Sequence, residues 1–168
     1  MMINFIIGRF NIDNAWFQYG RKQGIAYAQR EKLVAPEISL GGNFSYDKNG
    51  HFYSTTKIYG YIKKSEIKES YLFWLGLFNS KLFWYFIQKT GYVLRGGYFT
   101  FKTNYILPFP IPEHISEIDC LQIENLVQKI LLEKKNKNIK TDIFEKNIDE
   151  IIYNIYNLTE DEISEINT

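Results

Sequence analysis

The sequence predicts an α/β fold of the α+β type, in which a small mixed sheet packs on hydrophobic helices and an antiparallel helical pair follows. Three observations lead to this prediction. Residues 32–62 hold short β-branched runs divided by turn residues, whereas residues 71–87 are apolar on nearly every side. Residues 115–156 repeat apolar side chains every three to four positions, which is a helical period. With 168 residues, 45% of them hydrophobic, the chain is long enough to bury a core.

The first half of the chain predicts a set of short strands. Residues 32–39 (KLVAPEIS) and residues 57–62 have the composition of strands. Between them, residues 44–46 and 51–54 flank the turn sequence of residues 47–50, Asp-Lys-Asn-Gly. An Asn-Gly pair suits a tight β-hairpin, so we expect these two flanking segments to pair with each other.

The central segment predicts buried helices. Residues 68–88 are apolar almost all round, and Asn79 and Ser80 in their middle supply capping side chains. We therefore expect two helices or one bent helix. A membrane span over residues 71–87 would place Asn79, Ser80 and Lys81 at its centre, where hydrocarbon penalises them, so no membrane partner is expected.

The next segment returns to a strand pattern after Gly91. Residues 98–103 predict an edge strand, because Pro108, Pro110 and Pro112 cannot continue a central strand and force an extended exit. We place a domain boundary there, with a recognition domain over residues 1–112.

Residues 113–168 predict a helical region that packs on the first domain or contacts a partner. Two apolar helical segments are joined by the polar sequence KKNKNIKTD, and Thr159 with Glu162 forms a capping box for a last short helix. Residues 1–30 carry mixed signals, and we expect irregular structure with short helical pieces there.

The two parts of the chain differ in charge although the total is only +1. Residues 1–110 hold 14 Lys and Arg against 6 Asp and Glu, a net charge of +8, whereas residues 111–168 hold 6 against 13, a net charge of −7. Such asymmetry predicts that the first part meets a polyanion.

Motifs for catalysis and metal binding are not found. The sequence lacks the glycine-rich phosphate loop, the dinucleotide fingerprint, the serine elbow and the zinc-binding helix motif. One cysteine, Cys120, and two histidines exclude a standard structural zinc site within the chain and indicate a reducing cytoplasm. We predict no catalytic residue, no metal site and no cofactor in this chain.

Cations and glycines at predicted turns indicate nucleic-acid binding instead. Lys and Arg neutralise phosphates, loop side chains reach base edges, and glycine allows a close backbone approach. The strongest combination is RGGYFTFK, where cations, glycines and aromatic residues meet. The predicted DNA-binding residues are Arg21, Lys22, Lys48, His51, Lys57, Arg95, Gly96, Gly97, Tyr98 and Lys102.

Five stretches carry short motifs in a fixed order: WFQYGRKQG, KLVAPEISLGGNFSYDKNGHFYSTTKIYGYI, YLFWLGLFNSKLFWYFIQKTG, LRGGYFTFKTNYILPFPIP and NIDEIIYNIYNLTEDEI. Together they resemble the C-terminal specificity (target-recognition) domain of adenine-N6 DNA methyltransferases and type IIG restriction–modification enzymes, often called the TaqI-like specificity domain. Such a domain reads double-stranded DNA while a separate methyltransferase domain flips and methylates an adenine.

The resemblance also implies what this chain needs from a partner. The catalytic Asn-Pro-Pro-Tyr signature is missing, so the methyltransferase or endonuclease domain would be supplied in cis or in trans. S-adenosylmethionine and Mg²⁺ are then expected only in that catalytic partner.

Two alternatives stay open on the sequence alone. Asp47, Glu66 and Lys68 could form a self-contained, metal-dependent nuclease site. The C-terminal helices could instead make a structural assembly module through a coiled interface.

Overall fold

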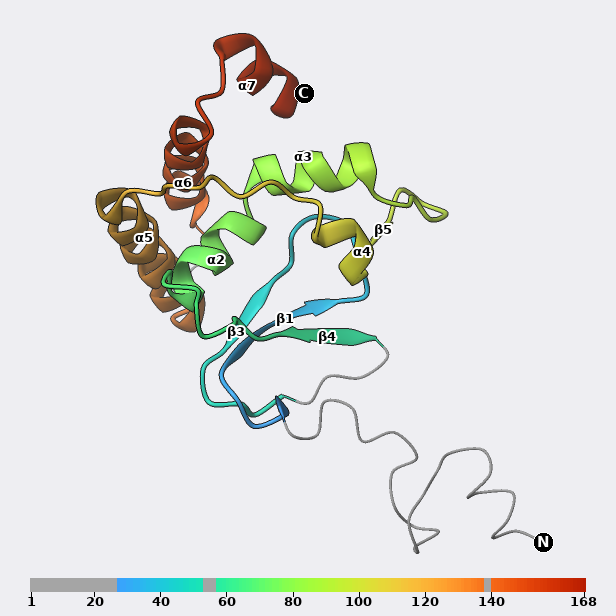
Figure 1. The fold of residues 1–168 in the computed structure, drawn as a ribbon, viewed down its shortest axis with the longest axis vertical. Helices are drawn as coiled ribbons and strands as arrows, with labels where there is room; N and C mark the ends of the chain where they lie inside the picture. The colour runs from blue at the N-terminus through green and yellow to red at the C-terminus, as the bar shows by residue number, and fades with distance from the viewer. Residues whose placement is uncertain (1–26, 53–56, 138–139) are drawn as a thin grey trace, which may run out of the picture.

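The computed structural model describes residues 27–52, 57–137 and 140–168, and its strands form two small sheets. One sheet has the order β3–β1–β4, and the other pairs β2 with β5 (Figure 1). The predicted combination of α and β structure is confirmed, although every described strand pair is antiparallel rather than mixed. The strands are β1 (Lys32–Pro36), β2 (Ile38–Ser39), β3 (Ser45–Asp47), β4 (Ile58–Tyr61) and β5 (Phe99–Thr100).

The described residues form six helices. Figure 1 shows α2 and α3 lying over the strands, while α5 and α6 stand side by side next to α2. The helices are α2 (Tyr71–Phe78), α3 (Lys81–Thr90), α4 (Thr103–Ile106), α5 (Glu117–Lys135), α6 (Asp142–Ile155) and α7 (Glu160–Ile166).

The apolar central segment breaks into α2 and α3 at Asn79 and Ser80, as the capping residues predict. The Ser80 hydroxyl accepts a hydrogen bond from the Phe83 N–H at 3.2 Å and so caps α3. The Asn79 side chain accepts from the Phe44 N–H at 2.9 Å and donates to the Phe44 carbonyl at 3.1 Å. The helix junction therefore also fixes the backbone that leads into β3.

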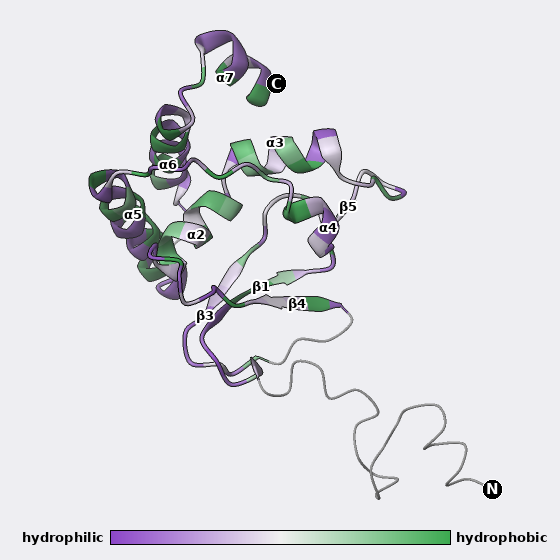
Figure 2. Cartoon of the chain, viewed as in Figure 1, coloured by the Kyte–Doolittle hydropathy of each residue, from purple (hydrophilic) through white to green (hydrophobic). Residues whose placement is uncertain are grey.

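One hydrophobic core joins the sheets, the central helices and the C-terminal helices. Figure 2 shows that α2 and α3 are largely apolar. Phe73, Phe83 and Phe101 are buried in this core together with Ile123 of α5 and Ile152 of α6. The helical region beyond residue 112 thus shares its buried surface with the preceding residues.

The predicted antiparallel pair is formed by α5 and α6. Lys134 near the end of α5 lies 3.5 Å from Glu145 near the start of α6. Gly76 of α2 faces both helices, because a Cβ atom built on it would lie 2.6 Å from Ile123 and 3.7 Å from Ile148. The missing side chain lets α2 approach this pair closely.

The last helices are fixed by polar side chains. The predicted capping box of Thr159 and Glu162 is present at the start of α7. Asp149 of α6 is buried, and its Oδ1 atom accepts a hydrogen bond from the Lys81 N–H at 2.9 Å. This carboxyl group therefore meets the N-terminus of α3 and links α6 to the central helices.

The predicted hairpin around residues 47–50 differs from the structure. β3 pairs with β1, in the register Lys32–Asp47, and not with residues 51 and 52 after the turn; residues 53 and 54 of the predicted partner lie outside the described residues. His51 and Phe52 are not in a strand, because their N–H groups donate to the Asp47 carboxylate at 2.9 Å each. The side chain of Asp47 thus binds the first two residues of the segment that the Asn-Gly pair suggested as a strand partner.

The predicted edge strand of residues 98–103 is shorter than expected. β5 ends at Thr100, and α4 begins at Thr103.

Among the residues that the structure describes, no helix is both long and apolar enough to cross a membrane. The prediction for residues 1–30 falls almost wholly outside the described residues.

Candidate nucleic-acid interface

A β-hairpin formed by residues 92–100 projects from the sheet of β2 and β5 (Figure 1). The Leu94 N–H donates to the Tyr98 carbonyl at 2.6 Å, and the Gly97 N–H donates to the Leu94 carbonyl at 3.2 Å. These bonds place Arg95 and Gly96 at the two central positions of the turn, the point farthest from the sheet.

The two glycines are required by this turn. Gly96 has φ = 87° and Gly97 has φ = 79°, in the left-handed region that other residues rarely adopt. A positive φ at the third position is what a type II turn requires, and a left-handed residue after the turn is typical of three-residue hairpin loops. Gly96 and Gly97 therefore shape the tip that presents Arg95.

The hairpin has an exposed tip and a buried base. Arg95 and Tyr98 are exposed, whereas Phe101 is fully buried. The ring of Phe99 meets Trp84 edge-on at 5.4 Å, and the ring of Phe101 stacks parallel to Trp84 at 6.3 Å. Packing on α3 thus fixes the base and leaves the tip in solvent.

Two further predicted residues, Lys57 and Lys102, lie at the base of this sheet. The Glu37 N–H donates to the Lys57 carbonyl, and the Glu37 carbonyl accepts from the Phe101 N–H, both at 2.8 Å. Lys57 is therefore bound directly to Glu37, and Lys102 directly follows Phe101, which is bound to Glu37 as well. Lys57 Nζ lies 3.8 Å from the Glu37 carboxylate, and its side chain is exposed, as is Lys102.

Lys48 and His51 lie at the other end of the β3–β1–β4 sheet. Lys48 follows Asp47, which pairs with the first residue of β1, whereas Lys57 precedes Ile58, which pairs with the last. Five strand residues separate these ends by roughly 13 Å, because a strand rises about 3.3 Å per residue. Both side chains are exposed, but they are not grouped with the hairpin.

A buried ion pair organises the end of the β3–β1–β4 sheet at which Lys48 and His51 lie. Lys32 Nζ lies 2.6 Å from Asp47 Oδ2, and it also donates to the Ala28 carbonyl at 2.7 Å. Burial by itself raises the pKa of Asp47, but the hydrogen bonds from Lys32, Phe52 and His51 outweigh it and lower that pKa. Asp47 is therefore ionised and accepts hydrogen bonds from three donors of the protein itself, which is a structural role.

This geometry weakens the nuclease alternative. A metal ion at Asp47 would have to displace Lys32 and the two backbone N–H groups. Glu66 is exposed and lies 3.9 Å from Lys64. Within the described ranges, no group of three or more His, Cys, Asp or Glu side chains could hold a metal ion.

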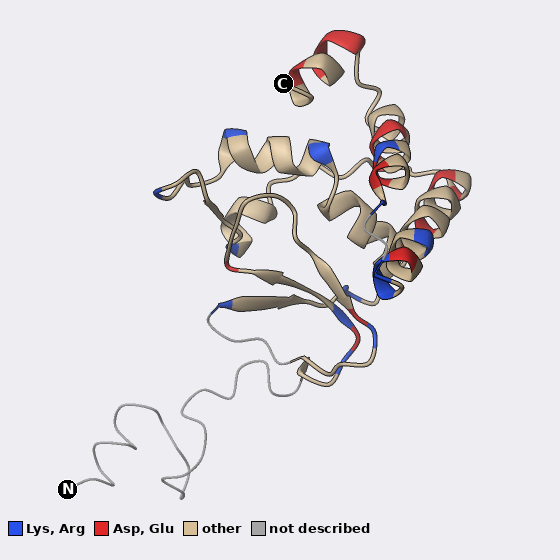
Figure 3. Ribbon diagram, turned by 180° about the vertical axis from the view of Figure 1, so that it is seen from behind, with Lys and Arg blue, Asp and Glu red and all other residues tan. Residues whose placement is uncertain are grey.

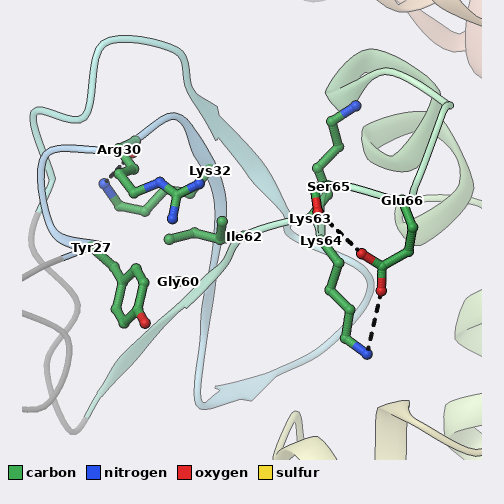
Figure 4. A pocket seen from close by; sticks show the side chains of 9 residues that line it. All are labelled: Tyr27, Arg30, Lys32, Gly60, Ile62, Lys63, Lys64, Ser65 and Glu66. Carbon is green, nitrogen blue, oxygen red and sulfur yellow. Dashed lines mark hydrogen bonds and ion pairs between the residues drawn. The ribbon is translucent and has the colours of Figure 1, made fainter.

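A pocket of about 590 Å³ opens at the end of the β3–β1–β4 sheet that holds Lys32 and Asp47. It lies between residues 27–32 and 62–66 (Figure 4). Figure 4 shows Tyr27 and Arg30 on one wall and Lys64 with Glu66 on the opposite wall. The Arg30 guanidinium lies 5.7 Å from the centre of the Tyr27 ring.

Sequence reasoning did not single out Arg30 and Lys64, because no turn motif marks them. Tyr92 is also exposed and lies opposite Thr100 in the hairpin, but its sequence neighbours carry no signal for that position. Arg21 and Lys22 lie outside the described residues.

Charge is distributed unevenly over the molecule. Figure 3 shows Lys and Arg at the tip of the hairpin before β5 and at the start of β4, whereas α5 and α6 carry Asp and Glu together with Lys, and α7 carries Asp and Glu without Lys or Arg. The net negative charge of residues 111–168 therefore lies mainly on the three C-terminal helices.

Comparison with known proteins places the chain in a family. A family model described as the TaqI-like C-terminal specificity domain matches residues 3–111. The matched range contains the hairpin and all the predicted site residues, and it ends before α5. No curated protein matches the chain.

Proposed function

Because the chain belongs to the family of TaqI-like C-terminal specificity domains, we propose that it reads a DNA sequence for a restriction–modification system of the type IIG kind. In this proposal it binds duplex DNA and positions a separate adenine-N6 methyltransferase or endonuclease domain on its target. It performs no chemistry of its own. S-adenosylmethionine and Mg²⁺ act in the catalytic partner, and the assembly works in the cytoplasm.

The projecting hairpin is the observation that carries this proposal. A two-stranded β-ribbon fits the width of the major groove, and an arginine can donate two hydrogen bonds to a guanine edge there. Arg95 lies at the tip, in a turn where two glycines adopt positive φ, and Tyr98 is exposed beside it. We therefore assign base reading to the tip.

Phosphate contacts are assigned to the exposed cations around the tip. Lys57 and Lys102 flank Glu37 at the base of the hairpin sheet. Lys48 and Arg30 lie at the far end of the neighbouring sheet. Two groups of cations separated along the surface can contact backbone phosphates on both sides of a groove and fix the register of the tip.

The acidic C-terminal helices are assigned to orientation of the catalytic domain. They share one core with the recognition part through Ile123 and Ile152. Their negative charge disfavours contact with DNA. A catalytic domain that docks on this region would be held at a fixed angle to the hairpin.

Selection of bound duplexes from a randomised library tests the proposed function. The 168-residue chain is expected to enrich a short common sequence, and Arg95→Ala is expected to lose that enrichment while it keeps salt-dependent binding. Enrichment of no common sequence by the wild-type chain, alone and with an added catalytic domain, would contradict the proposal.

A further inference from the structure

One face of α5 is unusual for a surface that meets water. Ile118, Leu121 and Leu132 are exposed by 67%, 57% and 60%. They align with Asn125 and Gln128 at intervals of three and four residues, which places all five on one line along the helix. The positions are those of the a and d residues of a heptad repeat.

Charged residues avoid this line. α5 carries seven Asp, Glu and Lys residues, and none of them occupies residues 118, 121, 125, 128 or 132. A solvated helix face usually carries its charges at the centre, whereas a face that pairs with another helix carries them at the edges. We call these five residues the α5 seam.

The opposite face of α5 is already used within the molecule. Ile123 and Val127 lie on the opposite face and are buried against α2 and α6. Glu124 accepts a hydrogen bond from the Ser70 hydroxyl at 2.6 Å on the α2 side of the seam. Lys129 lies over the ring of Phe144 on the α6 side, 5.9 Å from its centre. The seam is thus bordered by a carboxylate on one side and an ammonium on the other.

We propose that the α5 seam binds the α5 seam of a second copy of this chain, as a parallel two-stranded pair. In such a pair a residue at position g faces the residue five positions later on the other helix. Glu124 then faces Lys129 of the second copy, twice across the two-fold axis.

The polar members of the seam favour this occupant over an unrelated helix. Asn125 falls at an a position, where asparagine pairs with its own copy and specifies a parallel register of two strands. Its amide is self-complementary across a two-fold axis, since each copy offers a donor and an acceptor. The seam is short, so the pair is expected to be weak and concentration-dependent.

Sedimentation velocity on the 168-residue chain measures this association without DNA. The wild-type chain is expected to form dimers between micromolar and a few hundred micromolar. Leu121→Lys places a charge in the seam and is expected to raise the dissociation constant at least about tenfold. Leu40→Lys, at a site 53% exposed but outside α5, is the matched control and leaves the constant unchanged.

Asn125→Leu gives a second readout, because an apolar residue at this position strengthens a helix pair and relaxes its orientation. We expect tighter association for this variant. A monomeric wild-type chain throughout the concentration range overturns the proposal, as does an equal effect of Leu121→Lys and Leu40→Lys. Circular dichroism of each variant confirms that it is folded.

Cross-linking tests the parallel register. Leu132→Cys, at one end of the seam, is expected to form a disulfide-linked dimer when diamide accepts the two electrons, in a Cys120→Ser background, because only a parallel pair brings the two copies of this residue together. Asp119→Cys, which lies off the seam, is the control and is expected to cross-link at least about tenfold more slowly, because a disulfide requires close Cα atoms. Equal rates for the two variants overturn the parallel pairing. DNA binding is not needed for either test, so failure of this inference is distinguishable from failure of the proposed function.

Discussion

Lys32 and Asp47 form an ion pair in the interior of the protein, with each side chain only 2% exposed. They face each other across β1 and β3, and the carboxylate also accepts hydrogen bonds from the two N–H groups that follow the turn. One cross-strand contact therefore fixes the strand register, the turn that carries Lys48, and the position of His51.

Asp47→Asn is expected to lower the free energy of unfolding by about 3–5 kcal/mol, because it leaves Lys32 buried without a counter-charge. Urea denaturation measures the loss. Glu66→Gln makes the same chemical change in an exposed pair with Lys64 and is expected to cost less than about 1 kcal/mol. Similar losses for the two variants would contradict the structural role of the buried pair.

The Lys32–Asp47 pair also predicts that the free energy of unfolding depends on pH. The pKa of Asp47 is lowered in the folded state, so its stabilising contribution is present above the ordinary pKa of an aspartate and disappears as the pH falls through the lowered value. The difference in unfolding free energy between wild type and Asp47→Asn is therefore expected to shrink toward low pH.

For Asp149 we expect the opposite pH dependence of stability. Burial raises the pKa of Asp149, and the hydrogen bond from the Lys81 N–H only partly offsets this. Its stabilising contribution is therefore present below the ordinary pKa of an aspartate and decreases as the pH rises through the raised value. Asp149→Asn keeps an acceptor for that N–H but does not titrate. The stability of wild type relative to this variant should fall from about pH 4 upward. A difference that rises or stays constant would refute the prediction.

Gly76 predicts a steric coupling between α2 and α5. A Cβ atom at this position would lie 2.6 Å from Cγ2 of Ile123, so Gly76→Ala is expected to destabilise the protein by about 1–3 kcal/mol despite the better helix propensity of alanine.

The coupling is measured with a double-mutant cycle. Ile123→Ala leaves a cavity and is expected to cost about 2–5 kcal/mol, but the added methyl group of Gly76→Ala occupies part of that cavity. The double variant should therefore lose less than the sum of the single losses. Strict additivity would show that the two positions do not touch.

Arg95 and Lys102 predict two different losses in DNA binding. Arg95→Ala is expected to cost about 1–3 kcal/mol on the selected sequence and little on other duplexes, because it removes a base contact. Lys102→Gln should weaken binding to all duplexes and reduce the salt slope by about one. Fluorescence anisotropy at several salt concentrations separates these effects, and Lys146→Gln on the acidic helix α6 serves as the neutral control.

The elements that the sequence predicts correctly are those with local causes. Asn79 and Ser80 end one helix and begin the next, and Thr159 with Glu162 caps α7, because capping needs only residues within one turn. Local patterns fail where a distant partner decides. The Asn-Gly pair suggested a hairpin, but Lys32 draws Asp47 into another pairing from 15 positions away.

The same reasoning applies to the candidate site. The glycines after Arg95 indicated an unusual backbone at that position, and the structure has a turn there with positive φ. The separation of Lys48 from Lys57 could not be predicted, because strand register places them at opposite ends of β1. Arg30 and Lys64 were missed for a related reason, since only the fold brings their segments to one pocket.

The hairpin keeps its anchoring residues apart from its exposed ones. Phe99 and Phe101 hold the base on Trp84, whereas Arg95 and Tyr98 make up the tip. Changes at the tip positions leave the contacts of the base intact. If the hairpin reads DNA as proposed, randomising residues 95 and 98 on an unchanged framework is expected to alter target preference without a compensating change in the interior.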